Sequence, residues 1–126
     1  MNIAIIFAGG VGSRMHSKKT PKQFLKVYDK PIIVHTMEYF EKCSEVDAII
    51  AVCLKDWIPY LEELVSIYRL NKVKKVVEGG QTGQLSIYNG LRAAEQIANK
   101  QDAIVLIHDA VRPLINDDLI KKILVL

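Results

Sequence analysis

Asn2-Ile3-Ala4-Ile5-Ile6-Phe7 runs directly into Ala8-Gly9-Gly10-Val11-Gly12-Ser13-Arg14-Met15, and this junction decides the fold. The first six residues form a nearly continuous apolar run, as expected of a strand buried on both faces of a parallel sheet. The three glycines that follow allow a tight turn, and exposed N–H groups on such a turn bind anions. Five cationic side chains then fall within thirteen residues: Arg14, Lys18, Lys19, Lys22 and Lys26. The junction therefore predicts a binding loop for a polyphosphate, and we expect a nucleoside triphosphate.

Two familiar phosphate loops fit this stretch poorly. A P-loop requires Gly-Lys-Ser/Thr, which occurs nowhere in the chain. The dinucleotide fingerprint fits Gly10 and Gly12, but Met15 stands where its third glycine belongs. The plain alternative is a glycine-rich surface turn followed by solvated lysines.

The composition is that of an ordinary globular domain. The 126 residues are 50% hydrophobic and 25% charged, with a net charge of +3. This charge is too small to indicate nucleic-acid binding, and the first apolar run is too short for a signal peptide or a membrane span. Cys43 and Cys53 lack metal-binding spacing and are typical of reduced thiols in a cytoplasmic protein. We therefore expect no nucleic acid, no membrane and no zinc site.

Apolar runs and helical spacings alternate along the chain. We expect strands over 2–7, 48–54, 73–77 and 103–107. We expect four helices. The first begins with Pro31 at its first helical position, and the second has Asp56 as its cap. The third begins at Ser86, and the fourth begins at about Asp118 with Asp117 as its cap. For the first three helices the expected buried stripes are, in order, Ile33, Met37 and Phe40; Trp57, Leu61 and Leu64; and Ile87, Leu91 and Ala94. This alternation predicts an α/β fold with a parallel sheet and right-handed crossovers.

Ligands of open parallel sheets bind at the carboxyl ends of the strands. That rule places the glycine loop, the loop from Gly79 to Ser86, and Asp109 at one edge. Asp109 is suited to hold Mg²⁺ beside phosphate oxygens, although it could instead cap a turn. Arg112 could brace Asp109 or a phosphate. Ser86 could contact a nucleoside hydroxyl or only cap its helix.

Positive side chains near this edge suit phosphoryl or nucleotidyl transfer. In such reactions the protein mainly positions the reactants and neutralises oxygens that gain charge. Arg14 and Lys22 are the candidates for that role. No spacing of Ser, Cys, His and Asp residues indicates covalent catalysis.

Five segments in order and register carry a family resemblance: AGGVGSRM, PKQF, KPIIVHTMEYFE, GGQTGQLSIYNGL and IHDAVRPLI. Together they resemble the cytidylyltransferases of sugar-alcohol phosphates, which act in isoprenoid synthesis on methylerythritol 4-phosphate or in envelope-polymer synthesis on ribitol 5-phosphate. The resemblance covers residues 2–126 and implies a Rossmann-like nucleotidyltransferase fold with helices on both faces of the sheet.

The resemblance implies the following site, with Mg²⁺ as cofactor. CTP would lie along residues 9–14, Arg14 and Lys22 would be catalytic, and Asp109 would bind the metal and lie at the ribose end. The base would lie near residues 79–86. The full set of expected CTP-binding residues is Ala8, Gly9, Gly10, Gly12, Arg14, Lys22, Gly79, Gly80, Gln84, Ser86, Asp109, Ala110 and Arg112. The partners implied are CTP and a polyol phosphate, in a homodimer in the full-length form.

Two departures from the family pattern qualify these expectations. Gly83 stands where members usually carry an arginine, and we expect Gln84 to replace part of that contact. The chain also stops within its last expected helix, so we expect a truncated domain of about four βα units that covers residues 1–126. We expect one side of strand 103–107 to be unpaired, and we expect this chain to show little or no enzymatic turnover.

We expect ribitol 5-phosphate as the acceptor, because Gly9-Gly10 and the helix of residues 30–41 resemble the ribitol branch of the family slightly more. Methylerythritol 4-phosphate is the alternative. A non-catalytic CTP-binding fragment, a pyrophosphorylase that uses UTP or GTP, and a redox Rossmann protein are the other classes considered.

Overall fold

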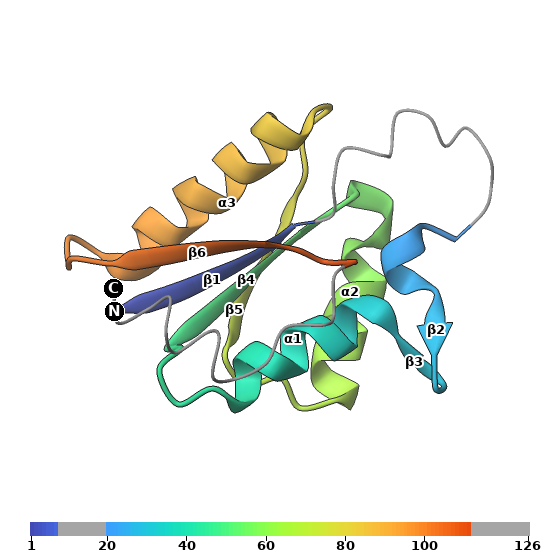
Figure 1. Cartoon of the computed structure of the whole chain (residues 1–126). Coiled ribbons are helices and arrows are strands. Elements are labelled where there is room, and N and C mark those ends of the chain that lie inside the picture. The colour runs from blue at the N-terminus through green and yellow to red at the C-terminus, as the bar shows by residue number, and fades with distance from the viewer. Residues whose placement is uncertain (8–19, 112–126) are drawn as a thin grey trace.

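The computed structural model describes residues 1–7 and 20–111. Its central element is a four-stranded parallel sheet with the strand order β5-β4-β1-β6 (Figure 1). The elements, in chain order, are β1 (Asn2–Phe7), the 3-10 helix η2 (Lys22–Phe24), β2 (Lys26–Val27), β3 (Lys30–Pro31), α1 (Ile32–Lys42), β4 (Ala48–Cys53), the 3-10 helix η3 (Lys55–Trp57), α2 (Ile58–Ile67), β5 (Val73–Glu78), α3 (Gly83–Ala98) and β6 (Ile104–Asp109). All four predicted strands of the sheet are confirmed to within two residues at their ends.

Helices cover both faces of this sheet, as the sequence predicts (Figure 1). Alternate residues of β1 point to opposite faces. Ala4 and Ile6 belong to the core under α1 and α2, whereas Ile3 and Ile5 belong to the core under α3. The predicted α/β fold with helices on both faces is therefore confirmed.

Helix α3 approaches the sheet through small residues, and of the stripe predicted for it only Ala94 is buried. Its buried residues are Ser86, Gly90, Ala93, Ala94 and Ala98. A Cβ added at Gly90 would come within 2.7 Å of Cγ2 of Ile5. Because the helix lies so close, only small side chains fit between it and β1. Leu91, expected in the buried stripe, is instead 40% exposed.

Three predicted helix starts were wrong by a few residues. Pro31 is the N-cap of α1 and not its first helical residue. Asp56 caps nothing, because it lies inside η3 and α2 begins after Trp57. Helix α3 begins at Gly83, three residues before Ser86, because the side chain of Thr82 accepts a hydrogen bond from the N–H of Leu85.

A small hairpin of β2 and β3 precedes α1, in a stretch for which the sequence analysis predicts no strand. Its two-residue tip is Tyr28-Asp29, and both residues have positive φ, 54° and 62°. Two contacts fasten the hairpin to α1. His35 Nε2 lies 2.6 Å from the carbonyl oxygen of Val27, and the ammonium of Lys30 lies 2.7 Å from the carboxylate of Glu38.

The last predicted helix, from about Asp118 with Asp117 as cap, lies outside the described residues. In residues 1–7 and 20–111, no helix is long and apolar enough to cross a membrane. Cys43 and Cys53 are both buried and form no disulfide.

Candidate functional site

The carboxyl ends of the four parallel strands meet at one edge of the sheet. Phe7 at the end of β1 pairs with Val52 of β4 on one side and with Asp109 of β6 on the other. Glu78 at the end of β5 pairs with Cys53. The segments after β1, β4, β5 and β6 therefore leave the sheet at this edge. Since β5 and β6 are three strand spacings apart, the edge extends over roughly 14 Å.

The loop after β5 is fastened at both of its ends. The N–H of Gly79 donates to the carbonyl oxygen of Cys53 at 2.7 Å. The N–H of Gly80 donates to Oγ of Ser86 at 3.1 Å, and Ser86 is only 2% exposed. Ser86 is thus not the helix cap that the sequence suggests but a buried link between the loop and α3. Its contact with a nucleoside stays a prediction.

Steric contacts explain why Gly79 and Gly80 are glycines. A Cβ on Gly79 would lie 2.9 Å from Oγ of Ser86. A Cβ on Gly80 would lie 2.2 Å from Cβ of Leu85, closer than two carbon atoms can approach. The loop can therefore lie against the first turn of α3 only without side chains at these positions. Gln84, the fourth candidate of this loop, is exposed on that first turn.

Gly83 differs from these two glycines because a side chain there meets open space. No heavy atom lies within 4 Å of a Cβ built on Gly83, and its φ is not positive. We expect Gly83→Arg to keep the melting temperature of the parent within a few degrees and to tighten CTP binding, because it restores a cation beside the expected base site. Calorimetric titration with CTP measures the change, with Gly83→Ala as the uncharged control. Equal CTP affinity of the two variants would show that a cation at position 83 contributes nothing.

Asp109 closes the opposite side of the edge. Its Oδ1 accepts a hydrogen bond from the N–H of Val111 at 2.9 Å, so the carboxylate caps a turn. The residue is half-buried, and one oxygen is engaged by this bond. The other oxygen suits Mg²⁺, which takes one or two carboxylates together with phosphate oxygens. The turn-cap interpretation is confirmed, and metal binding by Asp109 stays a prediction compatible with it.

A buried threonine that the sequence analysis missed holds the turn after Asp109. Thr36 of α1 is fully buried, and its hydroxyl lies 2.8 Å from the carbonyl oxygen of Ala110. The N–H of Ala110 in turn donates to the carbonyl oxygen of Phe7 at 2.8 Å. The sequence does carry a signal for the burial of Thr36. This residue lies three positions after Ile33 and four before Phe40, and therefore on the apolar face of α1.

Thr36→Val is expected to lower the free energy of unfolding by about 1–3 kcal/mol, because it leaves the Ala110 carbonyl buried without its donor. Thr36→Ser keeps the hydroxyl and should cost clearly less. Urea denaturation of both variants measures the difference. If the serine variant were the less stable of the two, the methyl group of Thr36 would matter more than its hydrogen bond.

Lys22 lies on the exposed side of an otherwise buried turn. Pro21, Gln23 and Phe24 are buried, whereas Lys22 is exposed. The N–H of Phe24 donates to the carbonyl of Pro21, and the N–H of Leu25 donates to the carbonyl of Lys22. The lysine thus projects from a fixed turn, as a group that must meet a ligand would.

Six of the predicted site residues lie outside the described residues: Ala8, Gly9, Gly10, Gly12, Arg14 and Arg112. The described part of the chain brings four of the predicted residues together, Gly79 and Gly80 in the loop after β5 and Gln84 and Ser86 in the first turn of α3. It places Asp109 and Ala110 at the end of β6, at the same edge of the sheet.

Cys53 ends β4 at this edge but supplies no nucleophile. Burial, with a smaller contribution from Glu62, raises the pKa of its thiol to about 12. The group therefore stays protonated at neutral pH. This agrees with the absence of any sequence signal for covalent catalysis.

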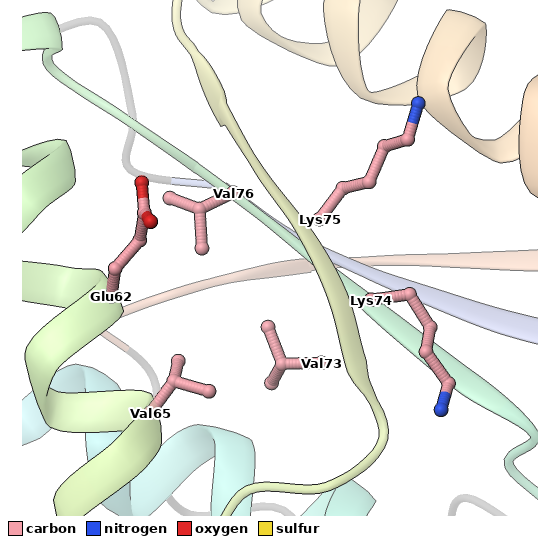
Figure 2. Close-up of a pocket in the computed structure, with 6 residues that line it drawn as sticks. All are labelled: Glu62, Val65, Val73, Lys74, Lys75 and Val76. Atoms are coloured by element: carbon pink, nitrogen blue, oxygen red, sulfur yellow. The ribbon is translucent and has the colours of Figure 1, made fainter.

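A separate pocket of about 360 Å³ lies between α2 and the first half of β5 (Figure 2). Figure 2 shows Val73 and Val76 of β5 pointing toward α2, and Lys75 pointing toward α3, where it bonds with Gln96. The pocket does not include the carboxyl end of β5. It is therefore distinct from the edge that collects the predicted nucleotide site.

Comparison with known proteins gives a consistent match. The family model for 2-C-methyl-D-erythritol 4-phosphate cytidylyltransferase matches residues 2–126. The chain is 58% identical over 120 residues to a ribitol-5-phosphate cytidylyltransferase from Streptococcus agalactiae serotype Ia, covering 95% of this chain and 50% of that protein. It is 42% identical over 121 residues to a 2-C-methyl-D-erythritol 4-phosphate cytidylyltransferase from Clostridium botulinum strain Loch Maree, covering 96% of this chain and 51% of that protein.

A solved structure has the same fold. The crystal structure of 4-diphosphocytidyl-2C-methyl-D-erythritol synthase from Anaerococcus prevotii superposes with a TM-score of 0.74 at 29% identity, over 97% of this chain and 48% of that one. The chain spans about half the length of the curated relatives it matches.

Proposed function

Because the chain belongs to the 2-C-methyl-D-erythritol 4-phosphate cytidylyltransferase family, we propose that it forms the CTP-binding half of a cytidylyltransferase. The reaction transfers CMP from CTP to a polyol phosphate and releases pyrophosphate. One observation of the structure carries the proposal: the loop at Gly79-Gly80 and the carboxylate of Asp109 lie at one edge of a parallel sheet, where such folds bind nucleotides.

The proposed reaction is an in-line displacement at the α-phosphorus of CTP. An oxygen of the acceptor phosphate attacks the α-phosphorus of CTP in line, and the bond from that phosphorus to the β-bridging oxygen breaks. Pyrophosphate leaves with the bonding electrons. Lys22 and Arg14 neutralise the charge that builds on the α-phosphate oxygens, a contribution that is largest in the transition state. Mg²⁺ held by Asp109 would share the charge of the triphosphate.

The base is recognised at the loop after β5. Because Gly79 and Gly80 carry no side chain, this loop lies against the first turn of α3, and the bond from the N–H of Gly80 to Ser86 holds it there. Gln84 is exposed beside this loop and offers an amide to the base. We propose that backbone groups of this loop supply the main part of the preference for cytosine.

Ribitol 5-phosphate is the acceptor that we propose, with methylerythritol 4-phosphate as the alternative. The support is the higher identity to the relative named for ribitol 5-phosphate, 58% against 42%. The assembly that we propose is a homodimer of the full-length form in the cytoplasm, in keeping with the two unlinked cysteines.

Titration calorimetry of this chain with CTP, with and without Mg²⁺ and beside GTP, tests the proposal. We expect selective, Mg²⁺-dependent binding of CTP. A folded chain that bound neither nucleotide would overturn the proposal. Equal binding of CTP and GTP would favour a less selective pyrophosphorylase.

Turnover separates the enzyme from a non-catalytic CTP-binding fragment. A completed form joins this chain to the second half of the Streptococcus agalactiae relative. Pyrophosphate release by the completed form, given CTP and ribitol 5-phosphate or methylerythritol 4-phosphate, supports the enzyme. CTP binding without release for either acceptor would favour the fragment.

Asp109→Asn is expected to shift the Mg²⁺ dependence of CTP binding to higher metal concentration. The amide oxygen can still accept from the N–H of Val111, so the turn persists while the charge is lost. Magnesium titrations at fixed CTP measure the shift, and Asp102→Asn, on an exposed loop residue before β6, is the control. An unchanged metal titration would assign the metal ligand to another residue.

A further inference from the structure

Three aromatic rings meet behind the turn that carries Lys22. The rings of Phe24 and Trp57 stack with centroids 4.8 Å apart and planes at 17°. Tyr60 lies against both, 5.4 Å from Phe24 and 5.6 Å from Trp57. We call Phe24, Trp57 and Tyr60 the aromatic clamp. Phe24 is 2% exposed, so the clamp buries the residue two positions after Lys22.

The clamp joins Lys22 to the edge of the sheet that holds the nucleotide site. Trp57 ends η3, which follows β4 directly, and Tyr60 lies in the first turn of α2. The turn η2 belongs to neither sheet of the described structure. Side-chain stacking against Trp57 and Tyr60, with packing against α1, therefore fixes its position.

We propose that Trp57 and Tyr60 are positioning residues for Lys22, which they hold at the α-phosphate of CTP through the ring of Phe24. The inference rests on the proposed function, because it gives Lys22 a role at CTP. A lysine ammonium is a point charge on a flexible stem, so the placement of its backbone decides where the charge can reach. Charge stabilisation in the transition state requires donors that are already in place.

This proposal explains why bulky aromatic residues stand at two half-buried positions. Trp57 and Tyr60 lie at the margin of the core formed under α1 and α2, where smaller apolar residues would also cover the sheet. A flat stacked contact restricts the tilt of Phe24 more than an aliphatic contact does. The clamp thus supplies orientation in addition to burial.

The catalytic test uses Trp57→Leu, Trp57→Phe and the control Leu64→Ala in the completed form. Leu64 is a buried residue of α2 outside the clamp, and its truncation should lower stability while all three rings of the clamp remain. We expect Trp57→Leu to lower kcat by roughly tenfold to a hundredfold, with KM for CTP changed by at most about threefold, because the charge is misplaced in the transition state. Trp57→Phe should recover most of kcat, and Leu64→Ala should retain it.

A second readout on this chain alone does not depend on activity. Hydrogen exchange at the N–H groups of Phe24 and Leu25, which close the turn, should be faster in Trp57→Leu than in Leu64→Ala at matched stability. Unchanged exchange, or an unchanged kcat in an active enzyme, would overturn the proposal. If the completed form does not transfer CMP, the proposed function fails, and faster exchange at the turn would still establish that the clamp holds it.

Discussion

Lys22→Ala is expected to lower the rate of CMP transfer in the completed form by roughly two to four orders of magnitude, with CTP affinity little changed. The lysine is exposed on a turn whose other residues are buried, so its removal takes away a charge without opening the core. The effect should therefore appear in kcat, where the charge on the α-phosphate is greatest. Single-turnover rates and calorimetric CTP binding, measured on the same protein, separate the two contributions.

The matched control for this variant is Lys26→Ala. Lys26 is an exposed lysine on β2, only four residues from Lys22, and its loss removes the same charge from the same region. If both variants lost similar activity, the effect would be a general attraction of the basic segment for phosphate. Equal losses of CTP affinity and rate in Lys22→Ala would instead assign Lys22 to ground-state binding.

Gly80→Ala should disable the base-side loop. The added Cβ would lie 2.2 Å from Cβ of Leu85, so the loop must move away from α3. That movement breaks the hydrogen bond from the N–H of Gly80 to Ser86 and leaves the buried hydroxyl without this donor. We expect a loss of about 1–3 kcal/mol in the free energy of unfolding and a loss of most CTP affinity.

Gly83→Ala tests whether this cost comes from the site or from the residue type. It makes the same chemical change three residues later, where no atom lies within 4 Å, and should be neutral or stabilising by up to about 1 kcal/mol in the helix. Urea denaturation and CTP titration of both variants give the comparison. Wild-type stability and affinity in Gly80→Ala would show that the loop accommodates a side chain and that its close packing on α3 is not required.

The strands were predictable because their signal is simple. The run from Ile3 to Ile6 is buried on both faces, and so are all six residues of β4, so continuous apolar sequence marked them without ambiguity. The carboxyl ends of parallel strands share an edge in every such sheet. The grouping of Gly79 with Asp109 at one edge therefore followed from the parallel direction of the strands alone.

Helix α3 shows where periodicity misleads. The spacing of Ile87, Leu91 and Ala94 suggested the inner stripe, but of these three only Ala94 is buried. Ser86, Gly90 and Ala93 lie on the buried side instead of the two large residues. Close approach of helix to strand selects small residues, and hydrophobicity scales give those residues little weight. Its start was also missed, because the signal at Thr82 was a side-chain cap followed by a glycine.

The supports of the site were the least predictable part. The bond from Thr36 to the carbonyl of Ala110 joins residues 74 positions apart, and the stack of Phe24 on Trp57 joins a turn to a different crossover. No local pattern encodes such contacts. The hairpin at Tyr28-Asp29 was missed for a local reason, since left-handed turns usually carry Asn or Gly there.

The central place of β1 has a consequence for how the chain is made. Ile5 pairs with Ile50 on one side and with Ile107 on the other, and the ammonium of Met1 donates to the carbonyl of Asp102, 101 residues further along. During synthesis, β1 can therefore pair with β6 only after about 100 further residues have been added, which takes roughly five to twenty seconds at ordinary rates of synthesis. During that time its apolar run has no neighbour on the β6 side. The sheet therefore closes only after β6 has been made, and until then one side of β1 is an unpaired edge at which chains can associate.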